Sequence, residues 1–270
     1  MIVTVTNSKG GVGKTTLVAN LAGYLADAGK RILAVDADIQ PALSSYYPIQ
    51  RQAGNGLRHL VTECDTRDVV SSTDIPGLDL IYSDDPRGTL QNFILHAADG
   101  RQRLHYTLDQ IQGDYDHILI DTQGAVGPLQ ESAIYAGDVV VSPIRPDKIS
   151  AAEFQRGSVR VVSEARSVAP RIGMTVGAMY GLLYGIERTM DARTFVEALT
   201  GLLRDRNDVY LLETRVPAAV AYKKAASMQL PVHRIDSRAR GKTSCGLEVM
   251  SRLARELLLS EKDRSNRGAR

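Results

Sequence analysis

The sequence predicts an α/β fold in which a mostly parallel, twisted sheet is covered by helices on both faces. Short apolar runs alternate with helix-like stretches along nearly the whole chain, which is the pattern of a buried parallel sheet. A glycine-rich segment, residues 9–16, lies between the first apolar run and the first helical stretch. No linker interrupts the alternation, so we expect residues 1–259 to form a single domain.

The individual elements follow from the apolar pattern, with Gly29, Pro76 and Gly77 marking turns. Short apolar runs predict strands at 2–6, 31–36, 78–83, 117–121, 139–143, 175–183 and 208–212. Longer stretches predict helices at 17–28, 90–112, 129–136, 150–167, 192–204, 216–226 and 245–259. The tail, 260–270, is polar and charged, and we expect it to be disordered.

The segment KGGVGKTT has the chemistry of a phosphate-binding loop. A glycine-rich turn between a strand and a helix gathers backbone N–H groups and a helix N-terminus around one point, where phosphate oxygens bind. Lys14 adds a cation for the β- and γ-phosphates, and the Thr15 hydroxyl suits Mg²⁺. The generic pattern has glycine where this chain has Ser8. The predicted binding residues are Lys9, Gly10, Gly11, Val12, Gly13, Lys14, Thr15 and Thr16.

Three carboxylates lie at the ends of predicted strands. Asp36 and Asp38 close the second strand, and Asp121 closes the strand at 117–121. In an open parallel sheet, ligands bind at the edge where the carboxyl ends of the strands meet. Asp121, at the end of an apolar strand, has the form of a magnesium-holding aspartate. An aspartate at a strand end is also a common turn residue, but their order behind a phosphate loop favours a catalytic site. No histidine is placed to act as a strong base, so we expect slow turnover.

The loop with two lysines, KGGxGKT, resembles the signature of the ParA/MinD group of ATPases. The likeness extends to YDHILIDT, AGDVVVSPIRPD and GLEVMSRLARELL, and so covers most of the chain. It implies a P-loop fold that binds ATP and Mg²⁺. It also implies that Asp38 positions the attacking water and that Asp36 helps to set the Mg²⁺ shell. Lys9 would reach across an ATP-bound homodimer to the partner's nucleotide. The alternative is that Lys9 is an ordinary exposed lysine.

The segment PIRPD, from Pro143, resembles the one that flanks the adenine in the group, although its two prolines also suit a rigid connection. Tyr184 and Pro217 are other candidates for the wall of the adenine site. The group usually has DTPP after the strand at 117–121, and this chain has DTQG. We expect Gly124 to make this segment more mobile and Gln123 to offer a hydrogen bond near the γ-phosphate.

Charge is distributed unevenly. Residues 1–185 hold 16 Lys and Arg against 20 Asp and Glu, whereas residues 186–270 hold 17 against 11. A basic C-terminal third indicates an anionic partner such as DNA or a membrane surface, or an ordinary solvated face. The resemblance to small ParA proteins favours non-specific DNA binding. The candidate contacts are Arg215, Lys223, Lys224, Arg238, Arg240 and Lys242.

The resemblance implies a cytoplasmic, nucleoid-associated ATPase that partitions plasmid, mobile-element or chromosomal DNA and that a ParB-like adaptor stimulates. The alternatives are a MinD-like membrane-positioning ATPase, a small-molecule kinase or ligase, and a non-hydrolysing scaffold. An apolar stripe on the last helix lacks bulky aromatic residues, so we expect core packing and no membrane partner. It comprises Leu247, Met250, Leu253, Ala254, Leu257 and Leu258. Cys64 and Cys245 lie far apart, which suits a reducing compartment and excludes a cysteine-held metal.

Overall fold

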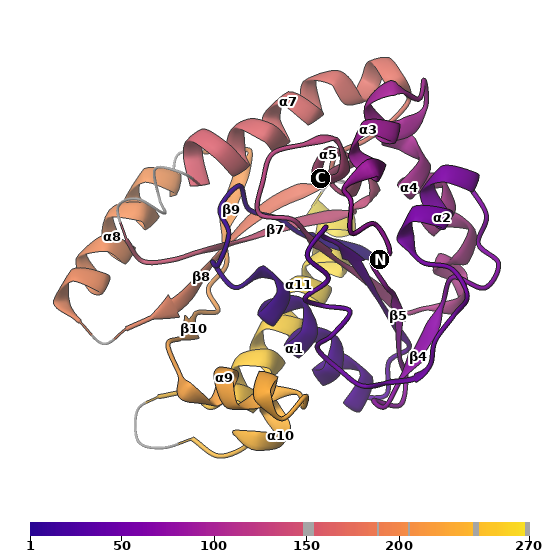
Figure 1. The fold of residues 1–270 in the computed structure, drawn as a ribbon. Coiled ribbons are helices and arrows are strands. Elements are labelled where there is room, and N and C mark those ends of the chain that lie inside the picture. The colour runs from indigo at the N-terminus through magenta and orange to yellow at the C-terminus, as the bar shows by residue number, and fades with distance from the viewer. Residues whose placement is uncertain (148–153, 188, 205, 240–242, 268–270) are drawn as a thin grey trace.

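A mixed β-sheet forms the middle layer of the molecule, with helices on both of its faces (Figure 1). The computed structural model describes residues 1–147, 154–187, 189–204, 206–239 and 243–267. These residues form a ten-stranded sheet in the order β10-β8-β7-β1-β6-β2-β5-β4-β3, with β9 beside β8. The parallel strands are β1 (Ile2–Val5), β2 (Ile32–Ala37), β5 (Leu78–Ile81), β6 (His117–Thr122), β7 (Val139–Ile144), β8 (Ala178–Ile186), β9 (Val209–Leu211) and β10 (Val216–Pro217). The antiparallel edge strands are β3 (Ile49–Arg51) and β4 (Ser71–Thr73).

The predicted fold class is confirmed. Strand β1 lies between β6 and β7 and is buried along its whole length, as is β2. Burial on both faces explains why these strands are mostly apolar, with Thr4 and Asp36 as the polar exceptions. The parallel register brings strand ends together at one edge, where Asp36 of β2 is the Cα partner of Asp121 of β6. The topology therefore brings two of the predicted carboxylates side by side.

Two groups of helices cover the sheet. On one face, α1 packs against α11, and Leu17 and Leu21 of α1 share a core with Leu253 of α11. This group comprises α1 (Lys14–Asp27), α9 (Val220–Ser227), α10 (Val232–Ile235) and α11 (Gly246–Arg267). The other face carries α2 (Leu57–Glu63), α3 (Thr89–His96), α4 (Gly100–Ile111), α5 (Pro128–Ala136), α7 (Arg160–Val168) and α8 (Met190–Arg204). Short turns η1 (Gln112–Asp114), η2 (Phe154–Val159) and η3 (Ala169–Ile172) complete the described helices.

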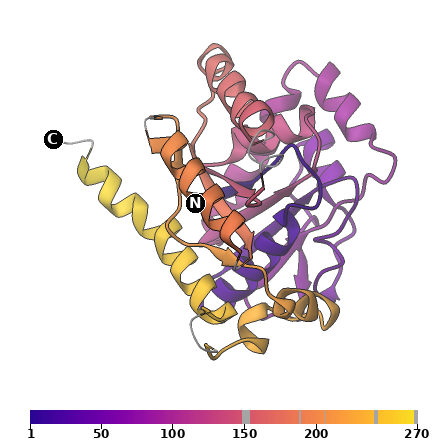
Figure 2. The ribbon, with the colours of Figure 1, turned by 90° about the vertical axis from the view of Figure 1, so that its left-hand side faces the viewer.

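Helix α11 confirms one expectation and departs from another. Met250, Leu253 and Leu257 of its apolar stripe are almost fully buried, so the stripe packs in the core as expected. The helix does not end near residue 259 but continues to Arg267. Its last turns extend away from the rest of the fold (Figure 2). Within the described segments, no helix combines the length and apolar character that crossing a bilayer requires.

Several element boundaries differ from the sequence prediction for local steric reasons. The helix expected at 90–112 is divided into α3 and α4, because the chain doubles back so closely that a Cβ on Gly100 would lie 2.2 Å from the Ile94 carbonyl oxygen. The helix expected from residue 216 starts at Val220, because Val216 and Pro217 form a short edge strand against β8. Proline is tolerated at such an edge, where no partner needs its missing N–H. The short strands β3 and β4 and helix α2 were not predicted.

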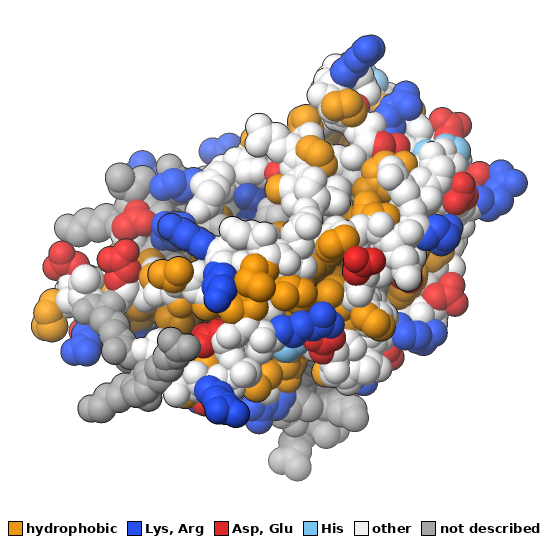
Figure 3. All heavy atoms as spheres, turned by 60° about the horizontal axis from the view of Figure 1, so that its bottom comes forward, with side chains coloured by type: hydrophobic (Ala, Val, Ile, Leu, Met, Phe, Trp, Pro, Cys, Tyr) orange, Lys and Arg blue, Asp and Glu red, His pale blue; other side chains and the backbone are white. Residues whose placement is uncertain are grey.

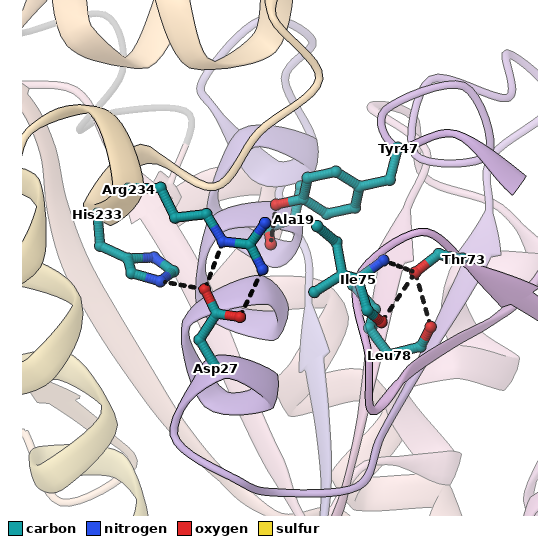
Figure 4. A network of polar contacts seen from close by, with 8 residues as sticks. All are labelled: Ala19, Asp27, Tyr47, Thr73, Ile75, Leu78, His233 and Arg234. Carbon is teal, nitrogen blue, oxygen red and sulfur yellow. Dashed lines mark hydrogen bonds and ion pairs between the residues drawn. The ribbon is translucent and has the colours of Figure 1, made fainter.

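A polar contact fastens the C-terminal region to the end of α1 (Figure 4). The Arg234 guanidinium donates to both carboxylate oxygens of Asp27, at 2.6 and 2.7 Å, and His233 Nε2 lies 2.7 Å from the same carboxylate. The hydrogen bond from Arg234 is the main cause of a lowered pKa for Asp27. Nearby, Tyr47 donates to the carbonyl of Ala19 at 2.9 Å. Helix α10 is therefore held to α1 by charge-assisted hydrogen bonds.

Replacement of Asp27 by alanine should destabilise the fold. Loss of the hydrogen bonds to Arg234 and His233 is expected to lower the free energy of unfolding at pH 7 by about 1.5–3 kcal/mol. The pKa of Asp27 is lowered in the folded state, so its contribution is complete above the unfolded pKa of about 4 and is lost as the pH falls through the folded value. Urea unfolding of wild type and variant between pH 7 and pH 3 measures both effects.

The control is Asp109→Ala, at an exposed position on α4, which should change stability by no more than about 0.5 kcal/mol. Equal effects of the two substitutions at pH 7 would contradict a structural role for the Asp27 contact.

Candidate functional site

The phosphate loop joins β1 to α1 at the carboxyl edge of the sheet. Gly11 and Gly13 have φ angles of 72° and 105°, in the left-handed region that glycine adopts without strain. Helix α1 begins at Lys14, and the Leu17 N–H donates to the Gly13 carbonyl at 2.9 Å. The backbone N–H groups of the first helical turn thus point toward the loop. The strand, loop and helix predicted from the sequence are all present.

Two neighbouring segments are in close contact with this loop. A Cβ on Gly124 would lie 2.8 Å from both N and Cα of Gly10. On another side, the ring of Tyr184 covers Gly13, where a Cβ would lie 2.4 Å from the ring. Gly124 therefore allows a close backbone approach, and the greater mobility that we expect from it stays a prediction. Gln123 beside it accepts a hydrogen bond from Gln91 at 3.0 Å, so its amide is already engaged by helix α3.

A cation and a carboxylate are buried together beneath the loop. Asp121 is fully buried at the end of β6 and accepts a 2.6 Å hydrogen bond from the Thr15 hydroxyl. Burial raises the pKa of Asp121 and lowers that of Lys14, although the attraction between the two opposes both shifts. The Lys14 ammonium donates to the Lys9 carbonyl at 3.2 Å. Lys14 is thereby held at the centre of the loop.

The residues around Asp121 fit a magnesium ion. Its second oxygen, Oδ1, is buried and has no hydrogen-bond partner among the described residues. That oxygen and the Thr15 hydroxyl are hard ligands of the kind that Mg²⁺ prefers. The described residues contain no cluster of three or more acidic, histidine or cysteine side chains that would enclose a metal by themselves. Magnesium would therefore complete its shell with phosphate oxygens and water.

Asp36 and Asp38 differ in role although they are two residues apart. Asp36 is fully buried, and one of its oxygens accepts hydrogen bonds from the N–H and the hydroxyl of Ser44, both at 2.7 Å. Its other oxygen accepts the N–H of Asp38 at 3.3 Å. Burial raises the pKa of Asp36 to about 6. Asp36 therefore fixes the segment after β2, and its part in setting the Mg²⁺ shell stays a prediction. Asp38 is half-exposed and lines the cleft.

A cleft of about 1010 Å³ opens above the loop. This is at the upper end of the range for small-ligand sites. Pro217 and Tyr184 line it, as expected for a base site. Pro143 does not: it lies buried within β7, where its carbonyl accepts a hydrogen bond from the Asn7 amide at 2.9 Å. Arg145, just beyond the end of β7, lines the cleft instead.

The predicted basic residues that the structure describes are all exposed. Lys223 on α9 lines the rim of the cleft. Arg215, Lys224 and Arg238 are exposed. In a view onto the α9–α10 end of the molecule, basic side chains are interspersed with hydrophobic and acidic ones (Figure 3). Arg240 and Lys242 lie outside the described residues.

The sequence analysis missed residues that support the loop from a distance. Tyr222 of α9 lines the cleft, and its buried hydroxyl has no hydrogen-bond partner among the described residues. Gln91 of α3 donates to Gln123, which lines the cleft, and Ser158 accepts the N–H of Ser8 at 3.2 Å. Their roles depend on contacts with residues far away in the sequence, and no local motif marks them.

The chain is similar to known proteins along its whole length. A family model described as an AAA domain matches residues 1–161. The sporulation initiation inhibitor protein Soj of Bacillus subtilis is 30% identical over 264 residues, covering 95% of this chain and 97% of Soj. The chromosome partitioning protein ParA of Caulobacter vibrioides is 28% identical over 275 residues, covering 99% of this chain and 97% of ParA.

A solved structure has the same fold. The septum site-determining protein MinD of Pyrococcus horikoshii, complexed with Mg-ADP, superposes with a TM-score of 0.69. The match covers 95% of each chain at 20% sequence identity. The two proteins therefore share the arrangement of sheet, loop and covering helices.

Gly124→Ala should weaken nucleotide binding, because the added methyl group would displace the Gly10 backbone by several tenths of an ångström or more. Overpacking of this kind costs about 1–3 kcal/mol, so we expect a loss of affinity of roughly tenfold. Titration with a fluorescent ATP analogue in the presence of Mg²⁺ measures it. The matched control is Gly113→Ala, where nothing lies within 4 Å of the new methyl group. Unchanged affinity in a folded Gly124→Ala protein would show that this contact does not shape the loop.

Proposed function

This chain belongs to the ParA/MinD family of ATPases, and we propose that it uses ATP hydrolysis to partition DNA between daughter cells. The observation that carries the proposal is that one cleft brings together the phosphate loop, Lys14 and Asp38, directly above Thr15 and Asp121. These groups have the charges and positions that phosphoryl transfer to water needs. The similarity of the chain to partition proteins along its whole length supports DNA as the cargo.

The hydrolysis step follows from the positions of these residues. The backbone N–H groups of the loop and the Lys14 ammonium would hold the phosphate oxygens. Asp38 would orient a water molecule for attack on the γ-phosphorus, while the bond from that phosphorus to the β–γ bridging oxygen breaks, giving ADP and phosphate. Thr15 and Asp121 would hold Mg²⁺, which neutralises charge on the β- and γ-phosphates. None of the described residues that line the cleft is a histidine, which supports slow intrinsic turnover.

We infer that Lys9 contacts the nucleotide bound to a second subunit. Lys14 already supplies the cation within its own loop and is bonded to the Lys9 carbonyl. Apolar side chains flank the same opening: Val220 is 80% exposed at the rim, and Val126, next to the lining residue Ala125, is 57% exposed. Burial of such surface would favour association of two copies face to face. ATP would then close a homodimer, and hydrolysis would open it.

The cycle of dimer closing and opening would act on two partners, DNA and an adaptor protein. The closed dimer would bind DNA without sequence preference through exposed basic residues such as Arg215, Lys224 and Arg238. A ParB-like adaptor on the centromere would accelerate hydrolysis and release the dimer, and the protein would reside on the nucleoid in the cytoplasm. The MinD-like alternative is less well supported, because the apolar stripe of α11 is buried against α1 as far as Leu257.

Lys9→Ala should separate nucleotide binding from dimerisation. We expect the variant to bind ATP within roughly threefold of wild type, because Lys14 and the loop backbone remain. It should not dimerise with a non-hydrolysable analogue, since each nucleotide loses the ammonium from across the interface. Light scattering coupled to size-exclusion chromatography measures the mass, and Lys14→Ala, which should lose nucleotide binding itself, is the control. Normal dimerisation of Lys9→Ala would refute the role of Lys9 in trans.

DNA binding should depend on both nucleotide and salt. With a non-hydrolysable ATP analogue, log affinity for random duplex DNA should fall with log salt concentration with a slope of about −0.9 per phosphate neutralised. Binding should be much weaker with ADP. Lys224→Ala should reduce the slope by about one unit per subunit in contact, whereas Arg193→Ala on α8 should leave it unchanged. Fluorescence anisotropy across a salt series gives these slopes, and a slope near zero with the ATP analogue would contradict DNA as the partner.

A further inference from the structure

A π-helical turn lies against the beginning of the phosphate loop. Residues Phe154–Val159 form this turn, η2, which leads directly into α7. Turns of this kind are rare and are found most often at functional sites. Ser158 is 1% exposed, and its hydroxyl oxygen accepts the N–H of Ser8 at 3.2 Å. The turn therefore holds the residue that immediately precedes Lys9.

Gly157, next to Ser158, has no room for a side chain. A Cβ at this position would lie 2.0 Å from Ser8 Oγ and 2.7 Å from Ser8 Cβ. Rotation of the Ser8 side chain removes the first clash but not the second, because Cβ moves only with the backbone. The φ angle of Gly157 is not in the left-handed region, so its backbone accepts alanine. Contact with Ser8, and not backbone conformation, requires glycine here.

The two neighbours of Ser8 in the chain, Asn7 and Lys9, are also anchored. The Lys9 N–H donates to the Asn7 side chain at 2.8 Å, and the Asn7 amide donates to β7 at Ser142 and Pro143, at 3.1 and 2.9 Å. A displacement of Ser8 therefore cannot be absorbed toward β7, where Asn7 is fixed. It would instead strain the hydrogen bond by which Asn7 holds the Lys9 N–H, and so shift the Lys9 backbone.

We propose that Gly157 and Ser158 are positioning residues for Lys9, which they direct toward the nucleotide of the second subunit. The inference rests on the proposed role of Lys9 in trans. It also accounts for Ser8, which stands where the generic loop pattern has glycine: the serine side chain fits here because residue 157 has none. Neither residue touches the phosphates, and both act through the backbone between Ser8 and Lys9.

The test adds a side chain at residue 157 and then removes the opposing side chain at residue 8. Gly157→Ala should reduce ATP-dependent dimerisation and hydrolysis by roughly 10- to 100-fold, the loss expected for a displacement of about 1 Å in a reacting group. Nucleotide affinity should fall less than dimerisation does, because the Lys14 side chain and the loop glycines remain, although the Lys9 carbonyl that holds Lys14 moves with the backbone. Adding Ser8→Gly to Gly157→Ala removes the opposing Cβ and should restore both activities to within roughly threefold of wild type. Gly201→Ala on α8, where nothing lies within 4 Å, is the matched helical control and should have no effect.

Each outcome of this experiment either supports or overturns the inference. Unchanged dimerisation in Gly157→Ala, or a loss that Ser8→Gly does not rescue, would overturn the inference. If Gly157→Ala does not fold, Ser158→Ala, which removes a hydrogen bond without adding bulk, should still lower dimerisation by roughly 3- to 10-fold, and wild-type behaviour would overturn the inference. The Lys9→Ala protein, measured in parallel, separates the two proposals. If it dimerises normally, the proposed role of Lys9 fails; if it does not dimerise while Gly157→Ala does, only the positioning role fails.

Discussion

The site depends on close packing around a loop that has no regular structure of its own. Three segments approach the loop so closely that one added methyl group would overlap another atom: at Gly124 against Gly10, at Gly157 against Ser8, and at Gly13 beneath the Tyr184 ring. A glycine-rich loop is conformationally permissive, and its entropy opposes any single shape. Contacts of this kind restrict it from several sides. The loop glycines allow the shape, and the surrounding segments select it.

Close packing also determines the surroundings of the two buried carboxylates, Asp36 and Asp121. Register places Asp36 and Asp121 side by side on β2 and β6, both fully buried, and burial raises the pKa of each. Two adjacent buried carboxylates repel each other unless each has compensating partners. Ser44 satisfies Asp36 with two hydrogen bonds, whereas Asp121 keeps one oxygen without a partner among the described residues. One carboxylate therefore builds the site, and the other remains available to a cation. The sequence alone predicts Asp121 as the magnesium-holding residue, but it does not show that Ser44 satisfies Asp36.

The local parts of the site could be predicted from the sequence, and the parts formed by distant segments could not. The strand, loop and helix around Lys14 follow from composition and spacing within a few residues, as does the position of Asp121 at the end of a strand. The bond from Ser8 to Ser158 spans 150 positions, and that from Asn7 to Pro143 spans 136. No local pattern encodes such contacts, so Pro143 was assigned to the base site and Gly157 was not noticed. Helix α11 extends beyond its predicted end into a stretch of mixed helix propensity, so local sequence does not set that boundary.

Net charge also needs the structure for its interpretation. Arg234 contributes to the basic C-terminal third, but its charge is compensated by Asp27 on α1. Lys223 and Lys224 are adjacent on α9, yet successive helical residues point about 100° apart, and only Lys223 lines the cleft. Helix α9 thus presents one cation to the nucleotide cleft and another to the outer surface. Under the proposed function, a nucleotide that shifts α9 would move Lys224 with it, because a helix moves as a rigid element. One short helix would in this way connect occupancy of the cleft to the affinity of the surface for DNA.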